Sequence, residues 1–165
     1  MDVKNLFELS DKVIILTGAS GLLGQQYSEA LSEKNVKLVL ADINYQKCKK
    51  LEKQLNEKFS NEILSLKVDV GSKQSVKNMV LKTMKKFNRI DGLINNAVFP
   101  ETVKERSIPL EEFPLDILKK IISVNTLGPF LCCQEVGKVM KKQKNGVIVN
   151  VSSIYGMVGA DQKIY

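Results

Sequence analysis

A glycine-rich segment at 17–24, Thr-Gly-Ala-Ser-Gly-Leu-Leu-Gly, is the strongest chemical signal in the sequence. It follows a short apolar run and precedes a helical pattern, which is the setting of a turn that binds the phosphates of a dinucleotide. We expect Gly18 to let the chain turn sharply, Gly21 to let the backbone approach a pyrophosphate, and Gly24 to let the helix pack against the strand. A strand–helix turn without a ligand is the alternative.

The start of the following helix completes this predicted site. Its unpaired N–H groups and the positive end of the helix dipole favour a phosphate, and the Ser20 hydroxyl adds a hydrogen-bond donor. Leu23 lies in the same turn and is counted among the cofactor-binding residues.

Asp42 closes the second apolar run and predicts which dinucleotide is preferred. A carboxylate at this place accepts hydrogen bonds from the hydroxyls of the adenosine ribose and repels a 2′-phosphate. No arginine or lysine stands at Ala19, Ser20 or Ile43 to neutralise such a phosphate. The sequence therefore favours NAD over NADP, and an aspartate that only caps a helix is the alternative.

Short apolar runs alternate with helical patterns along the chain. The runs are apolar throughout, which is typical of strands buried on both faces, and the helical stretches between them are long enough for crossovers. The sequence therefore predicts a doubly wound parallel α/β sheet, a Rossmann fold, as one NAD(P)-binding domain over residues 1–165 that lacks its C-terminal part. The expected strands are 13–16, 38–40, 63–68, one opening at 93–94, and 147–151.

Apolar stripes predict the buried helix faces. A clean stripe runs from 76 to 87, and Ser72 is placed to cap its helix. The helix after the glycine turn has a stripe of its own, formed by Leu23, Tyr27, Ala30 and Leu31. A weaker stripe follows the second strand and is formed by Tyr45, Cys48, Leu55 and Phe59.

A long helical segment is expected at about 115–142, with Gly128-Pro129 inside it. Pro129 has no N–H, so the carbonyl of Asn125, four residues earlier, loses its helical partner. A carbonyl freed in this way can bind an ordered water, and a simple kink is the alternative. Apolar residues lie on more than one side of the segment, so one stripe is left for a partner and predicts a homodimer or homotetramer at full length.

The composition of the 165 residues excludes several classes of protein. Hydrophobic residues make up 44% and charged residues 26%, which is ordinary for a globular chain and excludes disorder. The net charge of +7 comes from lysines without interleaved aromatics, which indicates a solvated surface rather than a nucleic-acid site. No apolar run is long enough to span a membrane, and the first residues lack the apolar region of a signal peptide.

Histidine and cysteine usage narrows the chemistry further. Histidine is absent, which excludes a histidine triad and a histidine metal site, and we expect no metal. The three cysteines form no disulfide framework, so a reduced, cytoplasmic location is expected. Cys132 and Cys133 are interpreted as core or interface residues of the long helix.

Several motifs occur in the order, and at the elements, that are typical of one family. Besides the glycine turn, they are Asp69-Val70, Asn95-Asn96-Ala97 after Asp91-Gly92-Leu93-Ile94, Asn125, and Ile148-Val149-Asn150-Val151-Ser152-Ser153. On these residues the chain resembles the short-chain dehydrogenase/reductase family, mainly its classical branch, over nearly its whole length.

This resemblance implies an NAD-dependent oxidoreductase that transfers a hydride between the nicotinamide and a hydroxyl or carbonyl carbon of a small-molecule substrate. It implies that Ser153 hydrogen-bonds the substrate oxygen, with Ser152 as the alternative, and that Asn125 holds water in a proton relay. The cofactor contacts that it adds lie at the ends of the third and fourth strands: Asp69, Val70, Asn96 and Ala97.

Two residues depart from the family pattern. Leu22 stands at the second glycine position and Gly21 precedes it, a spacing more similar to that of the extended, sugar-nucleotide branch. Val98 replaces the glycine that usually follows Asn-Asn-Ala, and we expect a small local shift rather than lost cofactor binding. A sugar-modifying relative, an epimerase or a dehydratase, is therefore an alternative.

The proton-handling pair of the family, Tyr-x-x-x-Lys, is expected after the catalytic serine. Tyr155 is too close to Ser153, and Tyr165 is the last residue, so we interpret Tyr165 as part of a loop. The sequence thus resembles a piece of a longer enzyme, inactive by itself, and a non-catalytic NAD-binding protein is a further alternative. Polyols, sugar derivatives, acyl intermediates and steroids all stay open as substrates.

Overall fold

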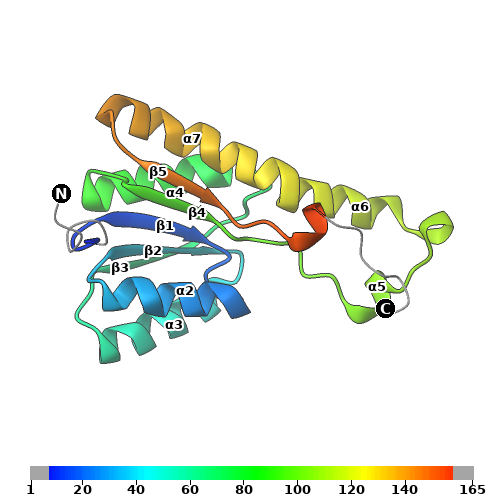
Figure 1. Cartoon of the computed structure of the whole chain (residues 1–165), viewed down its shortest axis with the longest axis horizontal. Coiled ribbons are helices and arrows are strands. Elements are labelled where there is room, and N and C mark those ends of the chain that lie inside the picture. The colour runs from blue at the N-terminus through cyan, green and yellow to red at the C-terminus, as the bar shows by residue number, and fades with distance from the viewer. Residues whose placement is uncertain (1–7, 158–165) are drawn as a thin grey trace.

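A parallel five-stranded sheet organises residues 8–157, the part of the chain that the computed structural model describes (Figure 1). The strands lie in the order β3-β2-β1-β4-β5, and each neighbouring pair is parallel. Their bounds closely match the expected strands: β1 (Val13–Thr17), β2 (Lys37–Asp42), β3 (Ile63–Lys67), β4 (Gly92–Asn95) and β5 (Val147–Asn150).

The strand order confirms the doubly wound fold. The chain moves outward from β1 to β3 and then returns to β4 on the other side of β1. The carboxyl ends of β1 and β4 therefore form the switch point at which open parallel sheets bind their ligands.

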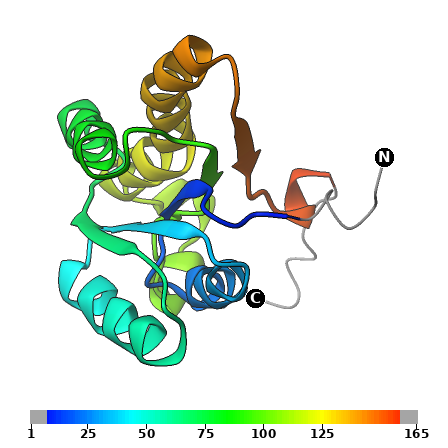
Figure 2. The same cartoon turned by 90° about the vertical axis from the view of Figure 1, so that its left-hand side faces the viewer.

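Helices cover both faces of this sheet, with α2 and α3 on one side and α4 and α7 on the other (Figures 1 and 2). Strand side chains alternate between the two layers, so that Leu38 and Leu40 pack toward α2 and α3, and Val39 packs toward α4 and α7. Both layers are apolar, as continuous apolar strands predict. The helices are α2 (Leu22–Glu33), α3 (Tyr45–Lys58), α4 (Lys73–Phe87), α5 (Val103–Arg106), α6 (Leu115–Ile122) and α7 (Gly128–Gln143).

The buried face of α2 matches the expected apolar stripe only in part, since Tyr27 and Leu31 pack against the core as half-buried side chains. Leu23 is 51% exposed and Ala30 is exposed, whereas the buried residues of this helix are Gly24, Ser28 and Ser32. These small residues recur every fourth position and let the helix axis approach the sheet closely. The Ser28 hydroxyl meets its hydrogen-bonding need within the helix by donating to the Gly24 carbonyl at 2.7 Å.

The other helices follow their sequence patterns more closely. Ser72 caps α4 by accepting a hydrogen bond from the Ser75 N–H, as expected. The buried residues of α4 are Val76, Met79, Val80 and Thr83. In α3 the expected stripe is partly wrong, since Tyr45 is 39% exposed. The buried residues of α3 are Cys48, Leu51 and Leu55.

The long helical segment is confirmed, but it is wound differently at its centre. Between α6 and α7, a π-helical turn (Ser123–Leu127) carries a hydrogen bond from the Gly128 N–H to the Ser123 carbonyl, five residues back. Such turns are rare and occur often at functional sites. The segment continues beyond the carboxyl end of the sheet, where α6 and α5 project (Figure 1).

The last described strand, β5, is less buried than its apolar sequence predicts. Val147 is 64% exposed and Val149 is 48% exposed, whereas Ile148 between them packs against the core layer of α4 and α7. Among the described residues β5 is an edge strand, since it pairs only with β4. Within residues 8–157, no helix has the length and apolar character that a membrane crossing requires.

Candidate functional site

The glycine turn has the geometry that its spacing predicts. Gly18 adopts φ +64°, the left-handed region that favours glycine, and a Cβ there would lie 2.7 Å from the Cα of Ala97. A Cβ on Gly24 would lie 2.2 Å from the Gly18 carbonyl oxygen. Gly21 donates its N–H to that same carbonyl at 3.1 Å, and a Cβ on it would meet only this oxygen, at 3.3 Å. The turn is therefore folded back on itself, with its Gly21 side open.

The N-terminus of α2 lacks a side-chain cap, unlike those of α3 and α4. Gly21 is its N-cap residue, no acidic residue lies in its first turn, and Leu22 is 84% exposed. In contrast, Asn44 caps α3 and Ser72 caps α4. The first-turn N–H groups of α2 are thus left for an external acceptor, and their partial positive charge suits an anion such as a pyrophosphate.

Thr17 fixes this turn to β4, a role that we did not predict from the sequence. Its hydroxyl accepts hydrogen bonds from the N–H groups of Asn96 (3.0 Å) and Ala97 (3.2 Å), and it donates to the Ile94 carbonyl at 3.3 Å. The Asn96 side chain donates to the carbonyls of Thr17 (3.1 Å) and Gly18 (3.2 Å). Asn96 and Ala97 therefore hold the glycine turn in place from the end of β4. Their contact with a cofactor stays a prediction.

Asp42 lies directly beside the turn. One of its carboxylate oxygens accepts the Ser20 N–H at 3.0 Å, and the other accepts the Asn44 N–H at 2.9 Å. Because a carboxylate has about four lone-pair sites, both oxygens keep capacity for ribose hydroxyls. The Ser20 hydroxyl makes no hydrogen bond to any described residue, which leaves it available to a phosphate.

Asp69 and Val70 follow β3 with different exposures. The Asp69 side chain is exposed, and its Oδ1 accepts the Gly71 N–H at 2.9 Å. The Val70 side chain is 8% exposed and lies against α7, where a Cβ on Gly128 would come within 2.8 Å of it. Only the backbone of Val70 is therefore placed to meet a cofactor, whereas the Asp69 carboxylate can do so directly.

A polar cluster beneath the carboxyl edge joins β4, β5 and α7. Asn95, which is 4% exposed, donates through Nδ2 to Asn150 Oδ1 at 2.8 Å and to Cys133 Sγ at 3.4 Å. This inter-strand bond fixes the strand that leads to Ser153. Burial raises the pKa of the neighbouring Cys132 thiol to about 12, which makes that cysteine an inert core side chain.

The two predicted catalytic residues lie at the same edge of the sheet. The Val151 N–H donates to the Asn95 carbonyl at 2.9 Å, which extends the pairing of β5 toward Ser153, and Ser153 precedes a 3-10 turn (Ile154–Gly156). Asn125 lies in the π-helical turn, and its Oδ1 accepts the Phe99 N–H at 2.8 Å. This bond ties the long helix to the loop after β4. Tyr165 lies outside the described residues.

A Tyr-x-x-x-Lys spacing does occur at Tyr45 and Lys49, at the start of α3. It follows β2, which is three positions away from β5 in the sheet, or roughly 14 Å at the usual strand spacing. Lys49 is also ion-paired with Glu52 at 2.8 Å. This pair therefore cannot act together with Ser153.

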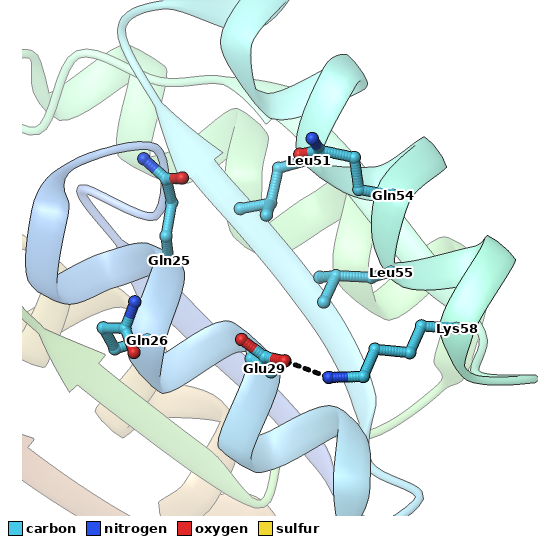
Figure 3. A pocket seen from close by; sticks show the side chains of 7 residues that line it. All are labelled: Gln25, Gln26, Glu29, Leu51, Gln54, Leu55 and Lys58. Atoms are coloured by element: carbon cyan, nitrogen blue, oxygen red, sulfur yellow. Dashed lines mark hydrogen bonds and ion pairs between the residues drawn. The ribbon is translucent and has the colours of Figure 1, made fainter.

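A groove of about 240 Å³ lies between α2 and α3 (Figure 3), and one of its lining residues, Gln25, donates to the Ser20 carbonyl of the glycine turn at 3.0 Å. Glu29 on α2 reaches Lys58 on α3 across it and forms an ion pair. Its lining residues are Gln25, Gln26, Glu29, Leu51, Gln54, Leu55 and Lys58. None of them belongs to the predicted site, so we interpret it as space between two packed helices.

Comparison with known proteins gives one family. The family model described as short chain dehydrogenase matches residues 12–165. Levodione reductase from Leifsonia aquatica is 30% identical over 151 residues, which cover 91% of this chain and 55% of that protein. A 3-oxoacyl-[acyl-carrier-protein] reductase from Synechocystis sp. is 32% identical over 154 residues, which cover 92% of this chain and 59% of that protein.

Comparison with solved structures gives a similar result for the fold. The structure of NAD+-bound xylitol dehydrogenase matches with a TM-score of 0.85 and 30% identity, over 93% of this chain and 57% of that one. The chain spans little more than half the length of the relatives it matches. With a family match over nearly all its residues, on a sheet and glycine turn of this geometry, the chain belongs to the short chain dehydrogenase family.

Proposed function

We propose that the chain forms the dinucleotide-binding part of an NAD-dependent oxidoreductase, which transfers a hydride between NAD and a hydroxyl or carbonyl group of a small molecule. The observation that carries the proposal is the closed glycine turn under an uncapped α2, with Asp42 beside it. NAD, when bound, supplies the hydride chemistry. The named relatives are reductases and a dehydrogenase, which favours this function over an epimerase, a dehydratase or a non-catalytic binding protein.

Each end of the cofactor has residues to receive it. The first-turn N–H groups of α2 and the Ser20 hydroxyl would bind the pyrophosphate, and Asp42 the adenosine ribose. Asp69 and the Val70 backbone would lie at the adenine. This division follows the order of the strands, since β2 and β3 lie on the adenosine side of β1 and β4 lies on the other.

Ser153 and Asn125 would serve the reacting end. The Ser153 hydroxyl would donate a hydrogen bond to the substrate oxygen, while Asn125, whose Oδ1 is held by the Phe99 N–H, would keep its Nδ2 for an ordered water. Neither side chain is a base near neutral pH. Residues 1–165 alone are therefore proposed to be inactive, because no Tyr-x-x-x-Lys pair follows Ser153 within them.

Replacing Asp42 is expected to change cofactor preference. Asp42→Ala in the full-length protein removes a charged acceptor of ribose hydroxyls and should weaken NAD binding about tenfold, with a smaller effect on NADP. Titrations with NAD and with NADP measure the two affinities. NADH absorbance with a panel of polyols, sugars and ketones then measures the activity. Asp42→Asn is the comparison variant, since it removes the charge but keeps one oxygen that can accept the N–H of Ser20 or of Asn44. Equal or tighter binding of NADP by the unmutated protein would contradict the preference for NAD.

We also propose that the full-length protein is a homodimer or homotetramer in a reducing, cytoplasmic compartment. The long helix leaves Ile122, Leu127 and Phe130 exposed, at 44%, 48% and 60%, while Val136 on another side is fully buried. A second apolar stripe is thus available to a partner copy. The three cysteines are free thiols, which supports a reducing compartment.

Sedimentation at micromolar concentration tests the assembly. The expected result is a dimer or tetramer that Phe130→Asp shifts toward the monomer, because the substitution places a charge in the apolar contact. Lys142→Gln, at an exposed position of the same helix, lowers the net charge by the same one unit and serves as the control. A monomer for the unmutated protein would refute the proposal.

A further inference from the structure

Lys67 and Asp42 end two neighbouring strands side by side. The register of β2 and β3 pairs Asp42 with Lys67 directly. Residues paired in this way point to the same face of a sheet, and Leu40 and Ile63, which have the same parity as Asp42 and Lys67, pack on the α2 and α3 side. A cation thus stands next to the carboxylate that was expected to repel a 2′-phosphate.

The Lys67 ammonium is not used within the described part of the fold. The Lys67 side chain is exposed and makes no ion pair or hydrogen bond with residues 8–157. Lys37, on the neighbouring strand, is in contrast ion-paired with Asp11 and Glu62. Asp42 accepts the N–H groups of Ser20 and Asn44 and forms no ion pair with Lys67, so the Lys67 ammonium is left for an anion that comes from outside.

Lys67 also lines an open cavity of about 450 Å³ at this corner of the sheet. The rest of the lining is the turn between β2 and α3: Ile43, Asn44, Tyr45 and Gln46. No carboxylate lines this cavity, while the Tyr45 hydroxyl and the Gln46 amide are hydrogen-bond donors. The space is large enough for a phosphate group and lies beside the residue proposed to hold the adenosine ribose.

We propose that Lys67 is a specificity-determining residue that pairs with the 2′-phosphate of NADP, so that the protein accepts NADP as a second, weaker cofactor in spite of Asp42. The inference rests on the proposed dinucleotide site and deepens it. Lys67 partly offsets the repulsion between Asp42 and the 2′-phosphate. With NAD, which carries a 2′-hydroxyl instead of a 2′-phosphate, Lys67 makes no ion pair, so it does not raise the affinity for NAD.

The test is to measure the dissociation constants of NAD, NADP, AMP and adenosine 2′,5′-bisphosphate for the full-length protein and its variants. Lys67→Gln should weaken NADP and the bisphosphate about threefold to fivefold, as expected for one solvent-exposed ion pair, with less than about a twofold change for NAD and AMP. Lys67→Arg should retain NADP binding. Lys50→Gln, which removes the charge of an exposed lysine on α3, is the control and should leave the ratio of the NADP and NAD dissociation constants unchanged.

The outcomes separate this inference from the proposed function. Binding of both dinucleotides with the same NADP-to-NAD ratio in Lys67→Gln as in the unmutated protein would overturn the role of Lys67 and leave the dinucleotide site standing. Absence of NADP binding by the unmutated protein, with NAD bound, would also overturn it. Binding of neither dinucleotide would overturn the proposed function and this inference together.

Discussion

Ser153→Ala in the full-length protein is expected to lower kcat about 10²- to 10³-fold while NAD affinity stays nearly unchanged. The hydroxyl would donate to the substrate oxygen as charge changes there in the transition state, and the loss of one such donor has a cost of this size. Ser153 lies beyond β5, two strands away from β1 and the glycine turn, and contributes none of the groups proposed to bind NAD. Steady-state kinetics and an NAD titration measure the two effects.

Ser152→Ala is the matched control, because it removes the same group one residue earlier. We expect it to retain most of the activity. A large loss of kcat in Ser152→Ala with little loss in Ser153→Ala would assign the role to Ser152, and equal small losses would remove both serines from the mechanism.

Gly24→Ala is expected to destabilise the protein by about 1–3 kcal/mol, the range for an overpacked site, and to weaken NAD binding at least about tenfold. The added Cβ would lie 2.2 Å from the Gly18 carbonyl oxygen and 2.8 Å from the Ala19 backbone. These neighbours are backbone atoms, which cannot rotate away as a flexible side chain can. The whole turn must therefore shift, and with it the N–H groups proposed to hold the pyrophosphate.

Gly137→Ala is the control for this substitution. Gly137 lies in α7, and a Cβ on it would meet nothing within 4 Å. Alanine is the better helix former there, so the variant should be as stable as the unmutated protein or more stable by about 0.5–1 kcal/mol. Denaturant unfolding and NAD titration of both variants give the comparison. Equal stability of the two variants would contradict the close packing of the turn.

The strands and the glycine turn could be predicted because their signals are local. A continuous apolar run such as 13–16 has only one stable place, between two helix layers, and this is where it lies. The buried face of α2 could not be predicted in the same way. Close packing on the sheet selected Gly24, Ser28 and Ser32, which carry no hydrophobic signal.

Contacts that depend on strand pairing could not be predicted from the sequence either. The proximity of Lys67 to Asp42 and of Asn95 to Asn150 follows from the register of parallel strands, which separated segments of one chain do not reveal. Thr17 was similarly ambiguous, because a threonine at a strand end has no distinctive pattern until β4 lies beside it. The motif residues were predictable because the family resemblance supplied roles that spacing alone does not.

The account depends above all on a dinucleotide bound at the glycine turn. Backbone amide shifts of the full-length protein, followed during titration with NAD, test this directly. The predicted result is saturable change concentrated at Gly18 to Gly24 and near Asp42 and Asp69. Saturation with these amides unchanged, or with changes confined to the groove between α2 and α3 (Figure 3), would contradict it.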